Sequence, residues 1–459
     1  MAVRFGTNGI REVVGGTLTA RVVGEVAGAF AQILGSGPAV VGRDGRTSSP
    51  AFARVVAGTL ASAGVDVFEL GLLPTPAIQY SVPRLGAQYA IIVTASHNPP
   101  EFNGIKGIAS DGLEIPPEAE RAIERAVEEG KAPRASFDRQ GRIRPDGAGV
   151  DRYVEGILGQ VDRDLIARKG LRVVLDCGNG ASAVTSPTLL SRLSVRALTL
   201  NANVDGLFPG HLSEPTEANL DDLLRTVQSV KPDLGVAHDG DADRAVFVDE
   251  GGRFVPGERI LALLAREAVR EAGGGTVVTP VTSSQAVEEV VGALGGRVHY
   301  TRVGSPVVSR AMKEQKAVFG GEENGGCLFP RHQLARDGAM TLAKVLEIVA
   351  RDGRPLSKIL AELPPFVLVK RKLPCPPGIR QGVLDDLAES LSASPGPGRS
   401  VVTLDGVKLV GPDGWLLVRP SGTEPLFRVF AEAREARRAE ALADEGVQLV
   451  QRAIDRRRS

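Results

Sequence analysis

Residues 94–100 read Thr-Ala-Ser-His-Asn-Pro-Pro and directly follow the apolar run Ala90-Ile91-Ile92-Val93. The apolar run is typical of a buried strand. Two prolines close the segment, so neither a helix nor a strand can continue through it. Ser96 is therefore expected in an exposed loop at the tip of an abruptly ended strand, where it faces a ligand. Taken alone, the segment also fits an ordinary polar turn.

Similar units recur three times along the first three-quarters of the chain. Each has an apolar strand, a helix-like segment, a second strand and a third strand that runs into a very polar loop. The first strands are residues 39–44, 173–178 and 276–280, the second strands are 65–70, 195–200 and 297–300, and the polar loops are 94–100, 238–244 and 320–326. This alternation predicts parallel strands covered by helices on both faces, with ligands beyond the carboxyl ends of the strands.

The length and the change of pattern near Pro364 predict the domain organisation. A chain of 459 residues exceeds one hydrophobic core, so about three or four domains are expected. After Pro364 come a strand at 366–369, a helical segment at 379–391, two strand-like runs and a final helix. We expect three similar α/β domains with mixed, largely parallel sheets over residues 1–150, 151–252 and 253–365, and a smaller α+β domain over 366–459.

The composition excludes several classes of protein. Lys plus Arg and Asp plus Glu number 55 each, so nothing suggests nucleic acid or an anionic membrane as the partner. No apolar signal-peptide core and no run long enough to span a bilayer is present. Cys177, Cys327 and Cys375 lack paired spacing, which argues against a disulfide framework or a zinc site. A cytoplasmic location is expected.

Residues 239–244 read Asp-Gly-Asp-Ala-Asp-Arg and place three carboxylates at alternate positions. Such a density of oxygen ligands suits Mg²⁺ or Ca²⁺. An EF-hand is rejected because Arg244 stands where that loop needs glycine and because strand-like runs flank the segment. Acids that only decorate a surface turn are the remaining alternative, although clustered like charge is costly without a cation.

Two further loops have the composition of ligand-binding segments. Residues 419–425, with Arg428 beyond them, combine two guanidinium groups, two hydroxyls and a glycine, which suits a phosphate but also fits a surface turn. Residues 320–326 place two glutamates and an asparagine among glycines, for acid/base chemistry, sugar hydroxyls or a plain glycine-rich turn. Lys106 follows the serine loop closely enough to stabilise charge or move protons there, or it is only a solvated side chain.

In order and spacing, these loops resemble those of the α-D-phosphohexomutases, which shift a phosphoryl group between the C1 and C6 oxygens of a hexose. The resemblance covers essentially the whole chain. Residues 5–11 look like the family's opening motif, 94–100 like its phosphoserine loop, 239–244 like its metal loop, 321–325 like its sugar loop and 419–425 like its phosphate loop. It implies three similar α/β domains and a smaller fourth around a central cleft, a phosphoserine enzyme, a hexose 1,6-bisphosphate intermediate that also acts as activator, and Mg²⁺.

The resemblance also implies a role for each candidate site residue. Ser96 would carry the phosphate and, with it, complete a Mg²⁺ site formed by Asp239, Asp241 and Asp243. The transferring group would be surrounded by Arg11, His97, Lys106 and Arg244, with Lys106 as the candidate general acid/base. The sugar hydroxyls would be bound by Glu322 and Asn324, and the phosphate that does not react by Arg419, Ser421, Gly422, Thr423 and Arg428.

The chain departs from the commonest family pattern at Asn8, Asn324 and Gly326, where aspartate, serine and histidine are frequent. The loop at 322–326 is similar to archaeal phosphoglucosamine mutases and phosphomannomutase/phosphoglucomutases. Glucosamine phosphate is therefore the first expected substrate, with mannose and glucose phosphates as the alternative. A phosphatase or phosphotransferase that passes the group from the phosphoserine to water or another acceptor and a non-catalytic sugar-phosphate sensor are rival functions. The expected partner is a small sugar phosphate, and the expected state is a monomer or small homo-oligomer.

Overall fold

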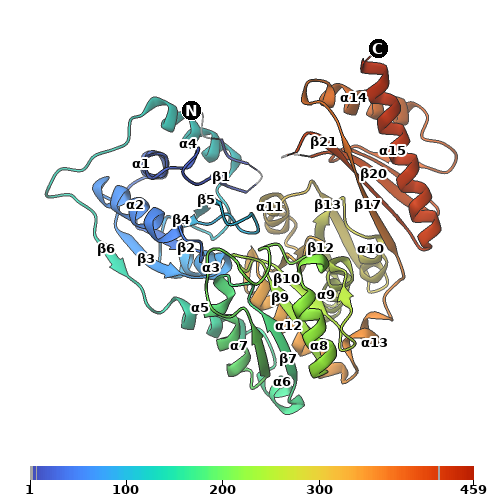
Figure 1. Cartoon of the computed structure of the whole chain (residues 1–459), viewed down its shortest axis with the longest axis horizontal. Coiled ribbons are helices and arrows are strands. Elements are labelled where there is room, and N and C mark those ends of the chain that lie inside the picture. The colour runs from blue at the N-terminus through green and yellow to red at the C-terminus, as the bar shows by residue number, and fades with distance from the viewer. Residues whose placement is uncertain (1–3, 7, 422–423, 459) are drawn as a thin grey trace.

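The computed structural model describes residues 4–6, 8–421 and 424–458 (Figure 1). Four β-sheets follow one another along the chain, from the blue N-terminal sheet on the left of Figure 1 to the red C-terminal sheet at the upper right. The first three sheets are mixed, and the fourth is entirely antiparallel. Three α/β units followed by an α+β unit are thus confirmed as the fold class.

The first sheet has the strand order β1-β5-β4-β2-β3-β6. Its strands are β1 (Ile10–Val13), β2 (Ala39–Arg43), β3 (Val67–Leu72), β4 (Tyr89–Val93), β5 (Phe102–Ala109) and β6 (Ile143–Pro145). Its helices are α1 (Ala20–Leu34), α2 (Ser49–Ser62), α3 (Thr75–Arg84) and α4 (Pro117–Glu129). Strands β4, β2, β3 and β6 are parallel to one another. At one edge, β5 pairs antiparallel with β4, and β1 pairs antiparallel with β5.

The second sheet has the order β11-β10-β9-β7-β8 and the third has β13-β12-β14-β15-β16. The strands of the second sheet are β7 (Arg172–Asp176), β8 (Arg196–Leu200), β9 (Leu234–His238), β10 (Ala245–Val248) and β11 (Phe254–Val255). The strands of the third sheet are β12 (Gly275–Pro280), β13 (Gly296–Thr301), β14 (Phe319–Gly321), β15 (Cys327–Phe329) and β16 (Gln333–Arg336).

The helices of this part are α5 (Gly149–Leu158), α6 (Arg163–Lys169), α7 (Ser186–Arg192), α8 (Asp221–Val230), α9 (Gly257–Ala272), α10 (Gln285–Gly292), α11 (Ser305–Gln315), α12 (Gly338–Asp352) and α13 (Leu356–Leu360), with short 3-10 helices at Ala181–Val184 and Glu217–Asn219. Among the helices of the described residues, none is both long and apolar enough to cross a membrane.

The three polar loops occupy the same place in the three sheets. In each unit the first strand (β2, β7, β12) lies between the second and third strands, and all three are parallel. The third strand (β4, β9, β14) then turns through the polar loop into an antiparallel strand. These loops are too short for the crossover of a dozen or more residues that a parallel return needs. Parallel pairing is therefore confined to the strands on one side of each polar loop, and the expectation of mixed sheets in three α/β units is confirmed.

The C-terminal sheet has the order β17-β21-β20-β19-β18, with neighbouring strands antiparallel. Its strands are β17 (Val367–Pro374), β18 (Ser400–Val402), β19 (Val407–Gly411), β20 (Gly414–Pro420) and β21 (Leu426–Ala433), and its helices are α14 (Pro377–Ala393) and α15 (Ala436–Arg458). The sheet and its helices share a core of their own, which includes Val383, Leu416 and Val450.

Two kinds of packing join the units. One continuous core runs through the first three, from Ile78 on α3 through Leu175 and Phe247 to Leu346 on α12. The C-terminal sheet instead meets the third unit through a small patch in which Trp415, Leu417 and Phe430 pack around Val281. The first three polar loops are therefore held rigidly together, while the fourth unit is attached more lightly.

A buried hydrogen bond between α5 and α12 reinforces the shared core. The Tyr153 hydroxyl donates to Asp337 Oδ1 at 2.5 Å, and the same oxygen accepts from the backbone N–H of Met340 at the start of α12. Tyr153→Phe removes a bond to a charged acceptor, so the free energy of unfolding should fall by about 1.5–3 kcal/mol, as measured by urea denaturation. Tyr300→Phe is the control, because its bond to Glu288 lies at the surface. Equal small losses for both variants would contradict this prediction.

Candidate functional site

Ser96 lies in the loop that joins β4 to β5, and it is completely buried. Its hydroxyl donates to Asp239 Oδ2 at 3.0 Å and lies 3.4 Å from His97 Nδ1. Its φ angle of 51° is in the left-handed region that non-glycine residues rarely adopt. The serine loop is thus present at the strand end, but the expectation of an exposed serine was wrong, because the loop carrying Asp239 packs over it.

The buried side chain of Arg46 holds the serine loop in this conformation. Its guanidinium donates to the carbonyl oxygens of Ser96, Asn98, Pro99 and Phe102 at 2.6–2.9 Å. Its Nε donates to Asp44 at 3.1 Å, which neutralises the buried charge. Sequence reasoning missed Arg46, although an Asp-Gly-Arg segment directly after the apolar strand 39–43 was a usable signal.

Asp44 connects Arg46 to the other side of the loop. Its carboxylate also accepts from the hydroxyls of Ser49 at 2.6 Å and Thr94 at 2.7 Å. The Thr94 hydroxyl in turn accepts from the backbone N–H of Ser96 at 2.9 Å. A chain of buried hydrogen bonds therefore sets the backbone of Ser96 from both sides, and this stabilises its strained conformation.

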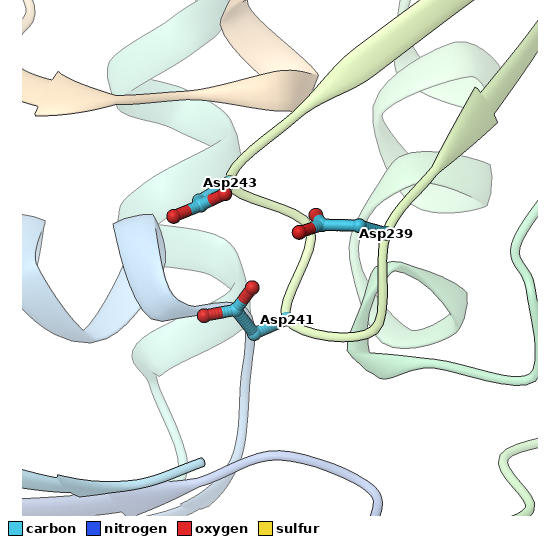
Figure 2. Close-up of side chains that lie close together, drawn as sticks. All are labelled: Asp239, Asp241 and Asp243. Carbon is cyan, nitrogen blue, oxygen red and sulfur yellow. The ribbon is translucent and has the colours of Figure 1, made fainter. Parts of the chain in front are cut away.

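The three aspartates of the metal loop, between β9 and β10, form one buried cluster. Figure 2 shows Asp239, Asp241 and Asp243 with their carboxylates on the same side of the loop. One oxygen from each lies within 4.8 Å of the others. Oδ1 of Asp241 and Oδ1 of Asp243 accept a hydrogen bond from no described residue. These two oxygens, with Asp239 Oδ2 beside Ser96, are a donor set that fits a small divalent cation.

The other carboxylate oxygens are held by neighbouring segments. Asp239 Oδ1 accepts from the backbone N–H of Arg244 at 3.2 Å. Asp241 Oδ2 accepts from the Thr75 hydroxyl at 2.7 Å, at the first turn of α3, where the helix dipole favours negative charge. Asp243 Oδ2 accepts from Arg336 Nη2. The cluster is therefore fixed by side chains and backbone from three units.

The charges of the cluster are unbalanced without a cation. Burial together with Asp243 and Asp241 raises the pKa of Asp239 well above its ordinary value. Burial opposes ionisation of Asp241 as well, but Lys106 and Thr75 outweigh it and lower the pKa of that carboxyl. Opposite pKa shifts of neighbouring carboxyls are typical of a set that cannot ionise completely by itself. A bound divalent cation would let all three ionise.

Basic side chains from two strands and from the metal loop lie beside the aspartates and the serine loop. Lys106 Nζ, on β5, lies 3.8 Å from Asp241 and 3.9 Å from Asp243 and has no hydrogen-bond partner in the described residues. Arg244 Nε is equally unpartnered, at 3.8 Å from Asp239 and Asp243. Arg11, on β1, donates to the side chain of Asn98 at 3.1 Å. Two of the predicted cations thus lie within 4 Å of the aspartates, and the third bonds to the serine loop.

His97 also belongs to this group. Burial, followed by the positive charges of Arg244, Arg11 and Arg336, lowers the pKa of His97 to about 2. The imidazole is therefore neutral beside Ser96 near pH 7.

The sugar loop, between β14 and β15, is bonded to the metal loop. Ala245, at the start of β10, donates its N–H to the carbonyl oxygen of Gly325. Gly325 has φ +90°, and a Cβ there would lie 2.5 Å from the Ala245 carbonyl oxygen, so only glycine fits. Glu322 is buried, with Oε1 accepting from Gly304 N at 3.2 Å and Oε2 from Arg336 Nη1 at 3.2 Å. Asn324 Oδ1 accepts from the N–H of Gly326, so part of that amide serves its own loop.

The phosphate loop lies in the C-terminal sheet, where Arg419 on β20 is directly opposite Arg428 on β21. Arg428 pairs with Glu424 at 2.8 Å. The backbone of the loop is held by Arg380 of α14, which donates to the carbonyl oxygens of Ser421 and Glu424 and was not predicted. Gly422 and Thr423 lie outside the described residues.

Asp405 links this loop to the third unit. It lies 3.2 Å from Arg419 and accepts from the backbone N–H of Val303, the residue before Gly304. The sugar loop and the phosphate loop are thus joined through one short segment.

Comparison with known proteins gives matches along most of the chain. The models named "Phosphoglucomutase/phosphomannomutase, alpha/beta/alpha domain I", "domain II" and "domain III" match residues 2–134, 151–252 and 256–366, and that of the C-terminal domain matches residues 370–449. The chain is 40% identical over 455 residues to a probable phosphoglucosamine mutase of Methanopyrus kandleri, with 99% of each chain covered. It is 38% identical over 459 residues to a phosphoglucomutase/phosphomannomutase of Thermococcus kodakarensis, covering 99% of this chain and 100% of the other.

A crystal structure of a phosphoglucomutase/phosphomannomutase family protein from Burkholderia thailandensis has the same fold. The TM-score is 0.88 at 28% identity, with 99% of this chain and 98% of that chain covered. The matches by sequence, domain order and fold agree with one another. The chain therefore belongs to the phosphoglucomutase/phosphomannomutase family of phosphohexomutases, enzymes that transfer a phosphoryl group within a sugar phosphate.

Proposed function

We propose that this enzyme interconverts hexose 6-phosphates and hexose 1-phosphates through a phosphoserine at Ser96 and a hexose 1,6-bisphosphate, with glucosamine phosphate as a favoured substrate. One observation carries the proposal: the Ser96 hydroxyl bonds to Asp239 of a buried three-aspartate cluster, and Lys106 and Arg244 lie within 4 Å of that cluster. Phosphoryl transfer depends mainly on positioning and charge neutralisation, which this arrangement is suited to supply.

The residues around Ser96 have different roles in the proposed reaction. Asp239, Asp241 and Asp243 hold Mg²⁺, which supplies positive charge to the phosphoryl oxygens when bound. Lys106 and Arg244 each have a buried nitrogen without a hydrogen-bond partner in the described residues, and these donors suit the transferring phosphoryl group. Lys106 is also the candidate to move the proton of the sugar hydroxyl, since it lies beside the serine loop without a fixed donor bond.

The phosphate that does not react is assigned to the C-terminal unit. Arg419 and Arg428 lie side by side on neighbouring strands, and Ser421, Gly422 and Thr423 complete the predicted cradle. A bisphosphate that reacts at either end must reverse between the two transfers, so the cradle must release it and bind it again. The small contact patch around Val281 and Trp415 supports a movement of this unit relative to the other three.

Two rival functions are less well supported. A phosphatase that passes the phosphoryl group from the phosphoserine to water has no need for a second phosphate site far along the chain. A sensor that only binds sugar phosphates has no need for a buried serine bonded to a metal-type carboxylate cluster. A cytoplasmic location and a monomer or small homo-oligomer remain predictions.

The first prediction concerns the phosphorylated residue. Ser96→Ala should lower mutase turnover by at least about three orders of magnitude, because it removes the group that carries the phosphoryl. The fold should persist, since Arg46 holds the loop through backbone carbonyls. Mass spectrometry of the active protein should find phosphate on Ser96. The control is Ser186→Ala, another buried serine, bonded to His238. An active Ser96→Ala variant with phosphate elsewhere would refute this role.

The second prediction concerns the metal. EDTA should abolish turnover and Mg²⁺ should restore it. Asp241→Asn should raise the Mg²⁺ concentration for half-maximal activity at least about tenfold, because one charged ligand is lost. Asp249→Asn is the matched control, since Asp249 directly follows β10 and its carboxylate accepts only from Gly251 and Arg253 in the next turn. Full turnover of a rigorously metal-free preparation would be incompatible with the proposed site.

The third prediction concerns the sugar. A 1,6-bisphosphate must bind with either its C1 or its C6 phosphate at Ser96. The C3 and C4 hydroxyls lie opposite the C1–C6 axis of reversal, so the sugar presents them similarly in both orientations. Glu322 would then tolerate changes at C2, so more than one of glucosamine, glucose and mannose phosphates should be turned over. One relative is named for glucosamine phosphate and another for glucose and mannose phosphates. Specificity constants measured with the bisphosphate present test this, and a preference beyond about a thousandfold, roughly 4 kcal/mol, would require a dedicated C2 contact.

A further inference from the structure

Arg336, the last residue of β16, contacts both the metal loop and the sugar loop. Its Nη2 donates to Asp243 Oδ2, and its Nη1 donates to Glu322 Oε2 at 3.2 Å. The side chain is buried, with 6% of its surface exposed. Asp243 and Glu322 are far apart in the sequence, so this guanidinium joins two segments that the chain itself does not connect.

Each of the two carboxylates is oriented by this contact. Glu322 Oε1 accepts from the backbone N–H of Gly304, and Arg336 holds its Oε2, so the whole carboxylate is fixed. Asp243 has one oxygen bonded to Arg336, and its other oxygen accepts a hydrogen bond from no described residue. The rigid, planar fork of a guanidinium suits this task because it donates in two fixed directions at once.

The charge of Arg336 is needed where it lies. Burial would lower the pKa of Arg336, but Asp243 and Glu322 outweigh burial and raise it. Without the guanidinium, Glu322 would lose its salt bridge and Asp243 would keep only the longer contacts with Lys106 and Arg244, and breaking a buried ion pair is costly.

Gly326 leaves the space that Arg336 occupies. A Cβ at position 326 would lie 2.3 Å from Arg336 Cδ, far inside normal contact distance. Unlike Gly325, Gly326 does not have a positive φ, so its backbone does not require glycine. Arg336 cannot easily move aside, because both ends of its guanidinium are bonded. Steric exclusion by Arg336 is therefore the physical reason for glycine at this position.

We propose that Arg336 is a positioning residue that orients Glu322 toward the sugar hydroxyls and locks the sugar loop to the metal loop, with Gly326 making room for it. The inference rests on the proposed function of Glu322 as the sugar ligand. Because Arg336 acts through Glu322, its loss should weaken binding of the sugar phosphate more than it slows phosphoryl transfer.

The test is Arg336→Met, which keeps much of the side-chain volume and removes the charge and both bonds. At saturating Mg²⁺, KM for the hexose monophosphate should rise at least about tenfold and by a larger factor than kcat falls. Calorimetry should show a similar loss of affinity in the Ser96→Ala background, where no turnover interferes. Arg336→Lys should recover part of the loss, since it keeps the charge but cannot bond both carboxylates.

Arg152→Met is the matched control, because Arg152 is also a largely buried arginine that bonds Asp146 and Ser81 away from the site. Its KM should stay unchanged even if its melting temperature falls. An unchanged KM for a folded Arg336→Met variant would overturn the proposal. A fall in kcat larger than the rise in KM would also overturn it, because Arg336 would then take part in the transfer itself.

Gly326→Ala provides an independent test in the same loop. The added methyl group should displace Arg336 and reproduce the rise in KM. In an Arg336→Ala background the same change should add little, because the clash is gone. Gly58→Ala in α2, where a Cβ meets no atom within 4 Å, is the control. Wild-type kinetics for Gly326→Ala, or additive effects of the two changes, would refute the steric argument.

Different results would refute the proposed function and the role of Arg336. A wild-type chain without turnover on any hexose phosphate would refute the proposed function. An active wild-type chain with unaltered Arg336→Met and Gly326→Ala variants would refute only the role of Arg336.

Discussion

The arrangement of this molecule depends on three buried carboxylates that lie within 4.8 Å of one another. Carboxylates so close together in a buried site repel, so the surrounding structure must supply positive charge. It does so from separate elements: Arg11 from β1, Lys106 from β5, Arg244 from the metal loop and Arg336 from β16. Each cation reaches the cluster only if its own sheet is correctly placed. The electrostatic balance of the site is therefore also a constraint on how the first three units pack.

The repeated topology explains how these units meet that constraint. In every mixed sheet the third strand turns back through a polar loop into an antiparallel strand, which puts the serine, metal and sugar loops at equivalent positions. One continuous core then fixes the three sheets relative to one another. The phosphate loop belongs to a unit with a separate core and a small contact patch. The groups near Ser96 therefore belong to units that share one core, whereas the phosphate loop belongs to a unit that meets the third unit through a smaller apolar contact.

The local elements of this fold could be predicted from the sequence, whereas contacts between distant segments could not. Apolar runs such as Ala90–Val93 identified the central strands, and the spacing of Asp239, Asp241 and Asp243 identified the cluster. Burial of Ser96 was missed because it depends on how the metal loop packs over the serine loop. Arg46, Arg336 and Arg380 were missed for the same reason. Their distant acceptors lie 14 to 93 residues away in the sequence and come close only when the chain folds. The local signal at Arg46 is the Asp-Gly-Arg segment that follows the apolar strand β2, whereas Arg336 ends β16 and Arg380 lies in α14.

Because position 326 lies so close to Arg336, substitutions at these two positions in evolution are expected to depend on each other. A lineage that carries Arg336 cannot gain a side chain at 326 without first shortening the arginine. A lineage that loses the arginine first must pass through a form in which Asp243 and Glu322 lack their shared cation. Either order crosses an unfavourable intermediate. The glycine and the arginine are therefore coupled sterically, so replacing this pair by another favours change at both positions.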